Sequence, residues 1–422
     1  MITDALVIGA GTAGLTAGIR LAQGGLRVTV VATGEGCLPL ASGTIDVLGF
    51  APEPVQSPRD ALPGFLDANP EHPYRIGGPA GIEASLAWFI KTAGPLGYHG
   101  ELSRNRWVPT VLGGLRPTAL VPHSMAAADL GGGGEVLIAG IRGFRDFHPA
   151  LLAANLSRAA AAPAHPIEAR ATLLDWPGGA GDMPPFRLAR RLEDAEIRRQ
   201  LAAQLRSKLS GASAVGMPAV LGRERAAEVH ADLERRLGRP VFEIPGLPPS
   251  LPGLRLFDRL RRALLDAGGR LLLGSTAISA THSHGTVAKV TITQASRPVE
   301  VSAGFFVLAT GGFATGGILR LPDGQLREPV FGLPVAGLAA GQEPFGDQYL
   351  AEHPLDRVGL STDADGRPLG AAGAPHATNL YAAGAVLAGA LPWREKSGEG
   401  LSLATGWHAA EGIVGHRREH AA

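Results

Sequence analysis

The first thirty residues constrain the fold more than any other stretch of the chain. Asp4–Ile8 is a short apolar run typical of a buried parallel strand, and Ala13–Gln23 has the apolar spacing of a helix. The connection between them carries a Gly-x-Gly-x-x-Gly motif, formed by Gly9, Gly11 and Gly14. Such glycines permit a tight turn, the approach of a phosphate to the backbone, and close packing of helix on strand. The stretch therefore predicts a nucleotide cofactor at the N-terminus of the helix.

Bulk composition excludes several classes of protein. The chain has 422 residues, enough for two or three domains, and its net charge of +1 gives no general attraction to nucleic acid. Cys37 is the single cysteine, which excludes disulfides and a Cys-ligated iron–sulfur cluster within the chain, and no metal ligands are assigned. The sequence contains neither the ~18-residue apolar run of a membrane helix nor a signal peptide. We therefore expect a cytoplasmic, loop-rich enzyme with no nucleic-acid partner.

Two later segments complete the pattern begun by the N-terminal motif. A helix (254–267), a strand (270–273) and an antiparallel meander (277–301) lead to a strand that ends in Ala309-Thr310-Gly311. Asn379–Gly384 is a further strand end, followed by a helix from about Gly400. These segments predict an α/β protein with a Rossmann-like FAD/NAD(P)-binding fold, the three-layer ββα flavoprotein type, with an inserted α/β domain.

The rest of the chain reads as insertions into that fold. The expected flavin-binding domain comprises 1–50, 251–315 and 375–422, the inserted α/β excursion comprises 51–250, and a substrate-side segment comprises 316–374. Within the insert we expect one helix in the Pro- and Gly-rich part (82–92), a strand from Glu135, a helix at 147–160, one long amphipathic helix at 187–209, and strands at 214–221 and 241–244.

The identity of the flavin depends on two positions where an acidic residue is missing. Dinucleotide-binding proteins usually end their second strand with an acid that holds the adenosine ribose, but Ala32 and Thr33 occupy that position here. Flavoproteins of this type commonly carry Asp where this chain has Ala385. FMN needs no adenosine contact, so FMN is the expected cofactor and FAD the alternative. The candidate cofactor-binding residues are Gly9, Gly11, Gly14, Thr33, Ser42, Gly43, Thr310, Gly311, Gly384, Gly400, Leu401 and Ser402.

Several blocks of the sequence resemble the B subunit of anaerobic glycerol-3-phosphate dehydrogenases. The similarity runs from residue 5 to about residue 410 and is thin between 149 and 240. The more specific blocks are His72-Pro-Tyr74 and Arg327-Glu-Pro-Val-Phe-Gly-Leu333, because the glycine motifs occur in many flavoproteins. Further blocks are Ala41–Asp46, Leu247–Ser250, Ala309–Gly317 and the C-terminal Ala-Ala-Gly segment.

The resemblance implies a complex that oxidises sn-glycerol 3-phosphate to dihydroxyacetone phosphate. In it, this FMN-bearing subunit pairs with a larger FAD-bearing catalytic subunit. A membrane-associated iron–sulfur subunit passes the electrons to quinone. The protein would then be cytoplasmic and peripherally associated with the inner membrane through its partner subunits.

Oxidation of a secondary alcohol at a flavin requires a base for the hydroxyl proton and cations for the phosphate. The candidate bases are His72 and His353. The candidate phosphate ligands are arginines, whose guanidinium fork matches phosphate oxygens, and Arg327 is favoured because it lies in a family-like block. The other arginines considered are Arg75, Arg320 and Arg357.

Two alternative functions remain open at this stage. The weak base candidates and the missing Asp at position 385 are compatible with a non-catalytic electron-relay or assembly subunit. The flavin fold alone is also compatible with a stand-alone flavin-dependent reductase of the fumarate-reductase type.

Overall fold

The chain divides into two compact units that each contain discontinuous segments. The computed structural model describes residues 1–158, 165–177, 181–339 and 341–421. Unit 1 comprises Met1–Cys37, Arg59–Thr92 and Phe257–Ala422, and unit 2 comprises Leu38–Pro58 and Ala93–Leu256. This division differs from the expected boundaries. Residues 59–92, expected in the insert, pack in unit 1, and residues 38–50 and 251–256, expected in the flavin-binding domain, pack in unit 2. The expected substrate-side segment 316–374 belongs to unit 1.

Unit 1 is built on a seven-stranded sheet with the N-terminal strand near its centre. The strands follow the order β11 (Arg270–Leu273), β2 (Val28–Ala32), β1 (Ile2–Ile8), β14 (Arg297–Leu308), β13 (Thr286–Gln294) and β12 (Ser275–Ser283). The first four run parallel, and β12, β13 and β14 form the predicted antiparallel meander. β17 (Leu380–Ala382) pairs in parallel with the end of β14, beyond the residues that pair with β13.

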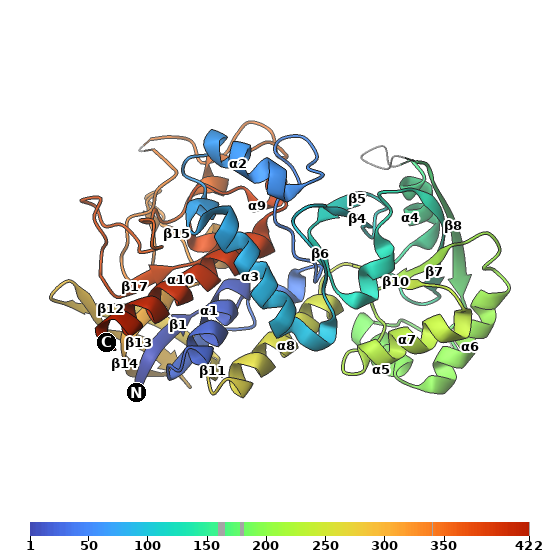
Figure 1. Cartoon of the computed structure of the whole chain (residues 1–422), viewed down its shortest axis with the longest axis horizontal. Helices are drawn as coiled ribbons and strands as arrows, with labels where there is room; N and C mark the ends of the chain where they lie inside the picture. Colours follow the sequence, from blue (N-terminus) through green and yellow to red (C-terminus); the bar gives the residue numbers. More distant parts are fainter. Residues whose placement is uncertain (159–164, 178–180, 340, 422) are drawn as a thin grey trace. The chain divides into compact units, whose positions relative to one another are not determined.

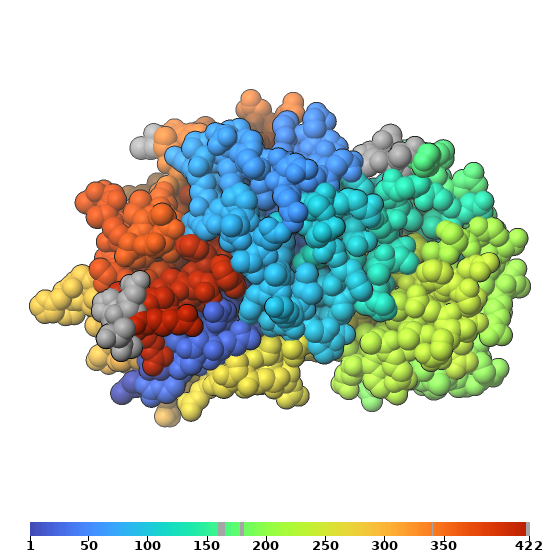
Figure 2. Space-filling view, viewed as in Figure 1, coloured from blue at the N-terminus to red at the C-terminus, as the bar shows by residue number. Residues whose placement is uncertain are grey.

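Two long helices pack together against this sheet. α1 (Thr12–Gln23) and α10 (Gly398–Ala421) lie side by side in front of the central strands (Figure 1). Their close approach requires Gly406, because a Cβ there would overlap the carbonyl oxygen of Ala13. Figure 2 shows the same neighbourhood at the surface, where the red C-terminal helix lies against the dark blue N-terminal segment. The ends of the chain therefore build the same layer.

Further helices complete the architecture of unit 1. The segment 59–92 supplies most of α2 (Pro58–Ala68) and of α3 (Gly78–Ala93), where the sequence predicted one helix only. α8 (Leu251–Asp266) contains the boundary between the two units, and α9 (Pro392–Glu395) is a single turn. Within the described parts of the chain, no helix is both long enough and apolar enough to cross a lipid bilayer.

Unit 2 contains a separate four-stranded parallel sheet. Its order is β10 (Val241–Ile244), β9 (Ala214–Pro218), β7 (Gly134–Ile141) and β8 (Ile167–Leu174). The helices are α4 (Pro149–Leu156), α5 (Pro185–Leu192), α6 (Ala195–Arg206) and α7 (Ala226–Leu237). Short antiparallel pairs join β4 (Arg106–Pro109) to β5 (Leu115–Thr118) and β3 (His99–Gly100) to β6 (Leu120–Val121). The expected α/β class is confirmed in both units.

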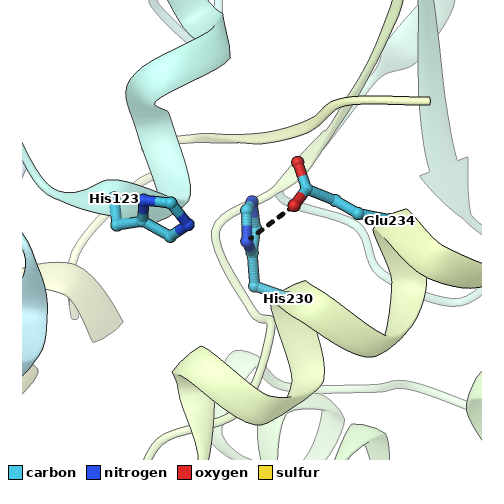
Figure 3. A group of neighbouring side chains, drawn as sticks. All are labelled: His123, His230 and Glu234. Atoms are coloured by element: carbon cyan, nitrogen blue, oxygen red, sulfur yellow. Dashed lines mark ion pairs between the residues drawn. The ribbon is translucent and has the colours of Figure 1, made fainter.

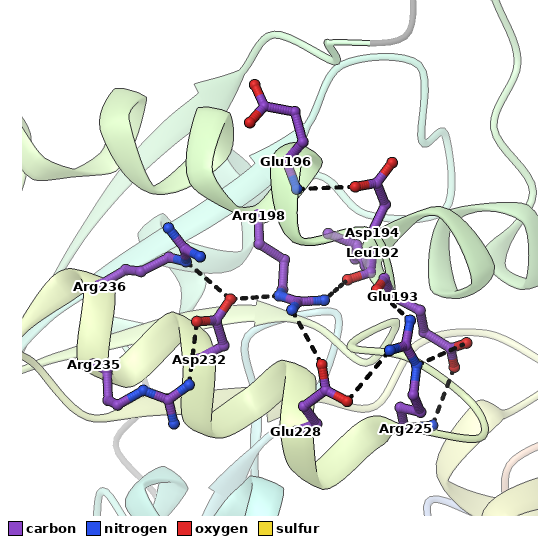
Figure 4. Close-up of polar contacts among 10 residues, drawn as sticks. All are labelled: Leu192, Glu193, Asp194, Glu196, Arg198, Arg225, Glu228, Asp232, Arg235 and Arg236. Atoms are coloured by element: carbon purple, nitrogen blue, oxygen red, sulfur yellow. Dashed lines mark hydrogen bonds and ion pairs between the residues drawn. The ribbon is translucent and has the colours of Figure 1, made fainter.

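The predicted amphipathic helix at 187–209 is in fact two helices, α5 and α6. The chain breaks at Asp194, whose side chain accepts a hydrogen bond from the backbone N–H of Glu196 (2.9 Å) and so caps α6. The side chain of Arg198 on α6 is buried and donates to Asp232 on α7 (2.6 Å) and to the carbonyl oxygen of Leu192 (2.9 Å) (Figure 4). This network fixes the bend and ties three helices together, which a leucine period does not reveal.

The predicted helix at 147–160 is also shorter than expected. α4 runs from Pro149 to Leu156. It begins at Pro149 because proline fits the first turn of a helix. Residues 159 and 160 of the prediction lie outside the described residues.

Candidate functional site

The three glycines of the N-terminal motif each serve a different geometric need. Gly9 has a φ of +118°, and a Cβ there would overlap the carbonyl oxygen of Ala309. A Cβ on Gly14 would overlap the carbonyl oxygen of Gly9, so helix and turn meet at backbone distance. Gly11 is the N-cap of α1, and no atom lies within 4 Å of the position that its Cβ would take. The open side of the turn therefore lies at Gly11, where the helix N-terminus favours an anion.

Four segments of unit 1 meet at the carboxyl edge of the parallel strands. The backbone N–H of Ala309, just after β14, donates to the carbonyl oxygen of Ile8 at the end of β1 (2.8 Å). A Cβ on Gly36 would lie 2.9 Å from the Cα of Gly11, so the loop after β2 approaches the same turn. Ligands of open α/β sheets bind at this edge.

The segment after β17 joins the same edge from the other side. Gly384 has a φ of +79°, and its N–H donates to the hydroxyl of Thr405 on α10 (2.9 Å). A Cβ on Gly312 would lie 2.5 Å from the carbonyl oxygen of Ala385. The structure thus brings together four predicted groups of cofactor residues: the glycine turn, Thr310-Gly311, Gly384 and the start of α10.

Thr310 carries a polar atom with unused hydrogen-bonding capacity at this edge. Its hydroxyl oxygen is buried and has no hydrogen-bond partner among the residues that the structure describes. A buried hydroxyl without a partner costs free energy, so its presence suits a ligand that supplies a polar group. Together with the open space at Gly11, this orphaned hydroxyl fits a phosphate-bearing cofactor.

The helix α10 begins two residues earlier than predicted. Its first residue is Gly398, and the N–H of Leu401 is already bonded to the carbonyl oxygen of Ser397 (2.8 Å). The N-terminal turn of the helix is therefore 398–400, which includes Gly400, whereas the side chain of Leu401 is buried in the core. The hydroxyl of Ser402 would lie 3.6 Å from a Cβ on Gly384, so Ser402 lines the joint between α10 and that loop.

The end of β2 has no carboxylate to hold an adenosine ribose. Ala32 is the last residue of β2, and the hydroxyl of Thr33 lies 3.1 Å from the hydroxyl of Thr276 on β12. The next acid along the chain is Glu35, a partly buried residue of the following loop. The strand end therefore offers hydroxyl groups only.

Ser42 and Gly43 belong to unit 2, where they take part in a polar network. The guanidinium of Arg116 is ion-paired with the buried carboxylate of Asp46 and donates to the hydroxyl of Ser42 (3.1 Å). Gly43 has a φ of +79°, and its carbonyl oxygen accepts a hydrogen bond from Tyr98 (2.6 Å). The structure accounts for both residues through contacts inside unit 2.

His72 is buried with both of its ring nitrogens engaged. Its Nδ1 accepts a hydrogen bond from the backbone N–H of Tyr74 (3.1 Å), so Nε2 carries the proton and donates to Glu395 (3.2 Å). The carboxylate of Glu395 also accepts from the N–H of Leu391 (2.8 Å) and from Ser397 (2.8 Å). This geometry favours His72 as a positioning residue for the 391–397 loop over a role as a base.

Burial would raise the pKa of Glu395, but the hydrogen bonds from His72, Leu391 and Ser397 outweigh burial and lower that pKa below 4.5. The stability that this depressed pKa contributes is fully present above pH 4.5 and is lost as the pH falls through the folded-state value. We expect the Glu395→Gln variant to be less stable by about 2 kcal/mol at neutral pH, because charge-assisted hydrogen bonds become neutral ones.

Urea unfolding at neutral pH and below pH 4.5 measures this effect. Wild type should lose stability on acidification, and Glu395→Gln should lose distinctly less. The matched control is Glu83→Gln, which removes an exposed carboxylate of the same unit and should keep the acid response of wild type. An acid response in Glu395→Gln as steep as that of wild type would contradict the assignment.

His353 is likewise held by the local backbone. Its Nδ1 accepts from the N–H of Gly346 (2.9 Å), and Nε2 lies 3.2 Å from the carbonyl oxygen of Tyr349. Among the described residues, no hydrogen bond or ion pair joins His353 to His72, and each ring is held by its own neighbours.

Of the four arginines considered for phosphate binding, Arg327 and Arg320 are the two without an ion-pair partner among the described residues. They lie in a two-stranded ribbon of β15 (Leu319–Arg320) and β16 (Leu326–Arg327), in which Arg327 is opposite Leu319. Directly opposed residues share a face, so Arg320 and Arg327 point to opposite faces of the ribbon. They cannot bind one phosphate together from the same face.

The other two arginines are occupied. Arg357 donates to Glu352 (2.7 Å) and to the carbonyl oxygen of Gly389 (3.0 Å). Arg75 donates to the carbonyl oxygen of Leu66 (2.7 Å).

The acid next to Arg327 has a structural task. Glu328 is fully buried and accepts hydrogen bonds from the backbone N–H groups of Val330 (2.8 Å) and Phe331 (2.7 Å). Burial raises its pKa, although these hydrogen bonds act in the opposite direction. The carboxylate of Glu328 therefore stabilises the loop through backbone hydrogen bonds. The side chain of Arg327 next to it is exposed.

The sequence did not single out Thr405 or Glu395, which organise the site's loops. Thr405 has a local signal, since it lies one helical turn after Leu401 and its hydroxyl bonds the carbonyl oxygen of that residue (2.7 Å). Glu395 has no such signal, because its partner His72 is 323 residues away in the chain.

Comparison with known proteins gives consistent matches along the chain. The family model described as FAD binding domain matches residues 4–401. The B subunit of the probable anaerobic glycerol-3-phosphate dehydrogenase of Halobacterium salinarum is 35% identical over 422 residues, covering 96% of each chain. The B subunit of the anaerobic glycerol-3-phosphate dehydrogenase of Pectobacterium atrosepticum is 34% identical over 420 residues, covering 97% of this chain and 98% of that one. Among solved structures, the 3-ketosteroid Δ1-dehydrogenase of Sterolibacterium denitrificans is similar over 98% of this chain and all of that one, with a TM-score of 0.48 and 13% identity.

Proposed function

Because the chain belongs to the family of anaerobic glycerol-3-phosphate dehydrogenase B subunits and carries an FAD binding domain, we propose that it takes part in oxidising sn-glycerol 3-phosphate to dihydroxyacetone phosphate. The family resemblance and the flavoprotein fold inferred from the sequence are confirmed. The protein is one subunit of a flavoprotein oxidoreductase, and its family supports a flavin cofactor, FAD most directly. Quinone as electron acceptor, and the identity of the partners, belong to the proposal.

The observation that carries the proposal is the convergence of the glycine turn, Thr310 and the N-terminus of α10 at one sheet edge. A bound flavin supplies a two-electron acceptor for the hydride of the substrate alcohol. The N–H groups beside Gly11 would hold its phosphate, and the hydroxyl of Thr310 would hydrogen-bond a polar group of the cofactor. The N-terminus of α10 would favour negative charge on a nearby part of it.

Within this class of cofactor we propose FMN, with FAD as the alternative. The absence of a carboxylate at Ala32 and Thr33, and the engagement of Thr33 with Thr276, support a cofactor without an adenosine half. The family model supports FAD instead. Acid release of the bound cofactor and determination of its mass decide between them, and release of FAD would refute the FMN assignment.

We expect the Thr310→Val variant to weaken flavin binding about tenfold, because Val keeps the shape of the side chain but removes the hydroxyl. The free energy of unfolding of the flavin-free protein should not fall, since the hydroxyl has no partner among the described residues. Fluorescence titration of the apoprotein with FMN measures the affinity. The control is Thr315→Val, which alters an exposed hydroxyl of the same loop. If Thr310→Val and Thr315→Val bind FMN with the same affinity, Thr310 is excluded as a ligand.

For the substrate, we propose that Arg327 binds the phosphate, because it is exposed and has no ion-pair partner among the described residues. In the complex with the proposed larger catalytic subunit, Arg327→Ala should raise the KM for glycerol 3-phosphate, and Arg327→Lys should restore part of the affinity. Arg320→Ala, on the opposite face of the same ribbon, is the matched control. Dye reduction that depends on glycerol 3-phosphate provides the assay.

The engaged nitrogens of His72 and His353 favour a second candidate, a non-catalytic electron-relay or assembly subunit. Such a protein would contribute flavin and contacts but no base. If Arg327→Ala weakens only the formation of the complex, with KM unchanged, the relay role is supported. If the complex is no more active than the larger subunit on its own, a catalytic role for this chain is excluded.

A further inference from the structure

Three side chains of unit 2 lie close together and turn toward one another. His123 begins a short helix, η4 (His123–Ala128), and His230 and Glu234 lie one turn apart on α7. One potential ligand atom from each residue lies within 4.8 Å of the other two (Figure 3). The Nδ1 of His230 and a carboxylate oxygen of Glu234 are 3.7 Å apart.

The tautomer of His230 is set by the backbone. Its Nε2 lies 2.7 Å from the carbonyl oxygen of Val241, which can only accept, so Nε2 carries the proton and Nδ1 carries a lone pair. The His230 side chain is 3% exposed, and its Nδ1 has no hydrogen-bond partner among the described residues. A buried lone pair is thus aimed at the carboxylate of Glu234 and the ring of His123.

His123 is held by the side chain of a neighbouring histidine. Its Nδ1 lies 3.1 Å from Nε2 of His99, which leaves Nε2 of His123 for the cluster. A second ring nitrogen bonded to a neighbouring group is the usual support of a metal-bound histidine.

We propose that His123, His230 and Glu234 form a Zn²⁺ site that links η4 to α7, with water in the fourth position. Two imidazoles and one carboxylate are a ligand set of tetrahedral zinc, with bonds of about 2.1 Å and hence ligand atoms about 3.4 Å apart. The separation of 3.7 Å between His230 and Glu234 is close to this value. The ligand atoms of the three residues lie within 4.8 Å of one another, and a small shift of His123, the exposed member, would close the remaining gap. Magnesium and calcium prefer oxygen ligands and do not suit the site.

The proposed ion would stabilise unit 2 by linking two of its helices. η4 follows β6, and α7 packs beside β10, so the metal would join two segments more than a hundred residues apart in the sequence. This role is independent of the proposed dehydrogenase function, because none of the three ligands belongs to unit 1.

The test uses the full-length protein, stripped of metal with a chelator and titrated with ZnCl₂ against a chromophoric competitor. We expect one tightly bound Zn²⁺ per chain, a rise in the melting temperature on zinc addition, and no effect of MgCl₂. Substitution with Co²⁺ should give the intense visible absorption of a tetrahedral site. Absence of stoichiometric zinc binding would overturn the proposal.

Variants assign the bound ion to these residues. His123→Ala and Glu234→Gln should each weaken zinc binding at least tenfold and abolish the rise in melting temperature. Both lie toward the surface, and Gln keeps an oxygen that can accept the hydrogen bond that Glu234 receives from the N–H of Val241. His148→Ala removes an exposed histidine elsewhere in unit 2 and should bind zinc within twofold of wild type. Equal weakening in His148→Ala, or unchanged binding in both cluster variants, would show that zinc binds elsewhere.

Discussion

We expect the Gly11→Ala variant to fold normally and to bind flavin at least about tenfold more weakly, a loss of ~1.4 kcal/mol or more in binding free energy, so that less flavin remains bound through purification. The backbone of Gly11 has a φ of −76°, which alanine adopts without strain, and its Cβ would meet no atom within 4 Å. The added methyl group would nevertheless fill the open side of the turn, where a phosphate has to reach the N–H groups of α1. Alanine is a somewhat poorer N-cap than glycine, so a small loss of stability is expected as well.

The ratio of flavin absorbance to protein absorbance after purification measures the retained cofactor, and circular dichroism monitors folding. The control is Gly81→Ala in α3, which also places a methyl group in open space but away from the turn, and which should keep all its flavin. Gly14→Ala provides the opposite comparison, because its Cβ would overlap the carbonyl oxygen of Gly9 and should disrupt folding itself. Full flavin content in Gly11→Ala would place the phosphate elsewhere.

The first strand and helix of the chain could be predicted because the sequence patterns that specify them are local. β1 and α1 lie within two residues of their predicted bounds, because apolar periodicity and helix-ending glycines depend on residues that are close together in the sequence. Strands β10 and β11 match their predicted ends for the same reason. The meander of β12–β14 also follows from the alternation of apolar and polar residues.

What the sequence did not reveal depends on contacts between distant segments. Packing places residues 38–58 in unit 2 and residues 59–92 in unit 1. Both segments are rich in Pro and Gly, so their composition does not predict this division. The two histidines of the proposed zinc site are more than a hundred residues apart, and only the His230–Glu234 spacing of one helical turn hints at it. The break between α5 and α6 had a local sign in Asp194, a preferred N-cap residue, but the leucine period concealed it.

The largest loss of stability is expected from breaking the ion pair of Arg255 and Glu243 in unit 2. Glu243 is fully buried, and the two side chains make a two-pronged contact with distances of 2.6 and 3.0 Å. Arg255 also donates to the carbonyl oxygen of Gly222 (2.9 Å), and Glu243 accepts from the N–H of Leu221 (2.8 Å). Burial would raise the pKa of Glu243, but Arg255 outweighs burial and lowers it, so the pair is charged at neutral pH.

Arg255→Met should therefore destabilise unit 2 by about 3–5 kcal/mol, because it leaves a buried carboxylate without its counter-charge. Urea unfolding monitored by tryptophan fluorescence measures the change, with Trp107 and Trp176 as probes in this unit. The control is Arg142→Met, which breaks the exposed pair with Asp175 and should leave the unfolding transition unchanged.

The double variant Arg255→Met/Glu243→Gln distinguishes charge burial from simple loss of packing. Glutamine is neutral and can still accept the hydrogen bond from Leu221, so the second substitution should recover part of the stability lost in Arg255→Met. The single variant Glu243→Gln completes the comparison. If the losses of stability in the two single variants add fully in the double variant, the pair is not coupled, and the cost of Arg255→Met comes from the cavity and from the unpaired carbonyl of Gly222. The recovered fraction thus measures how much of the stability of unit 2 depends on this one charge compensation.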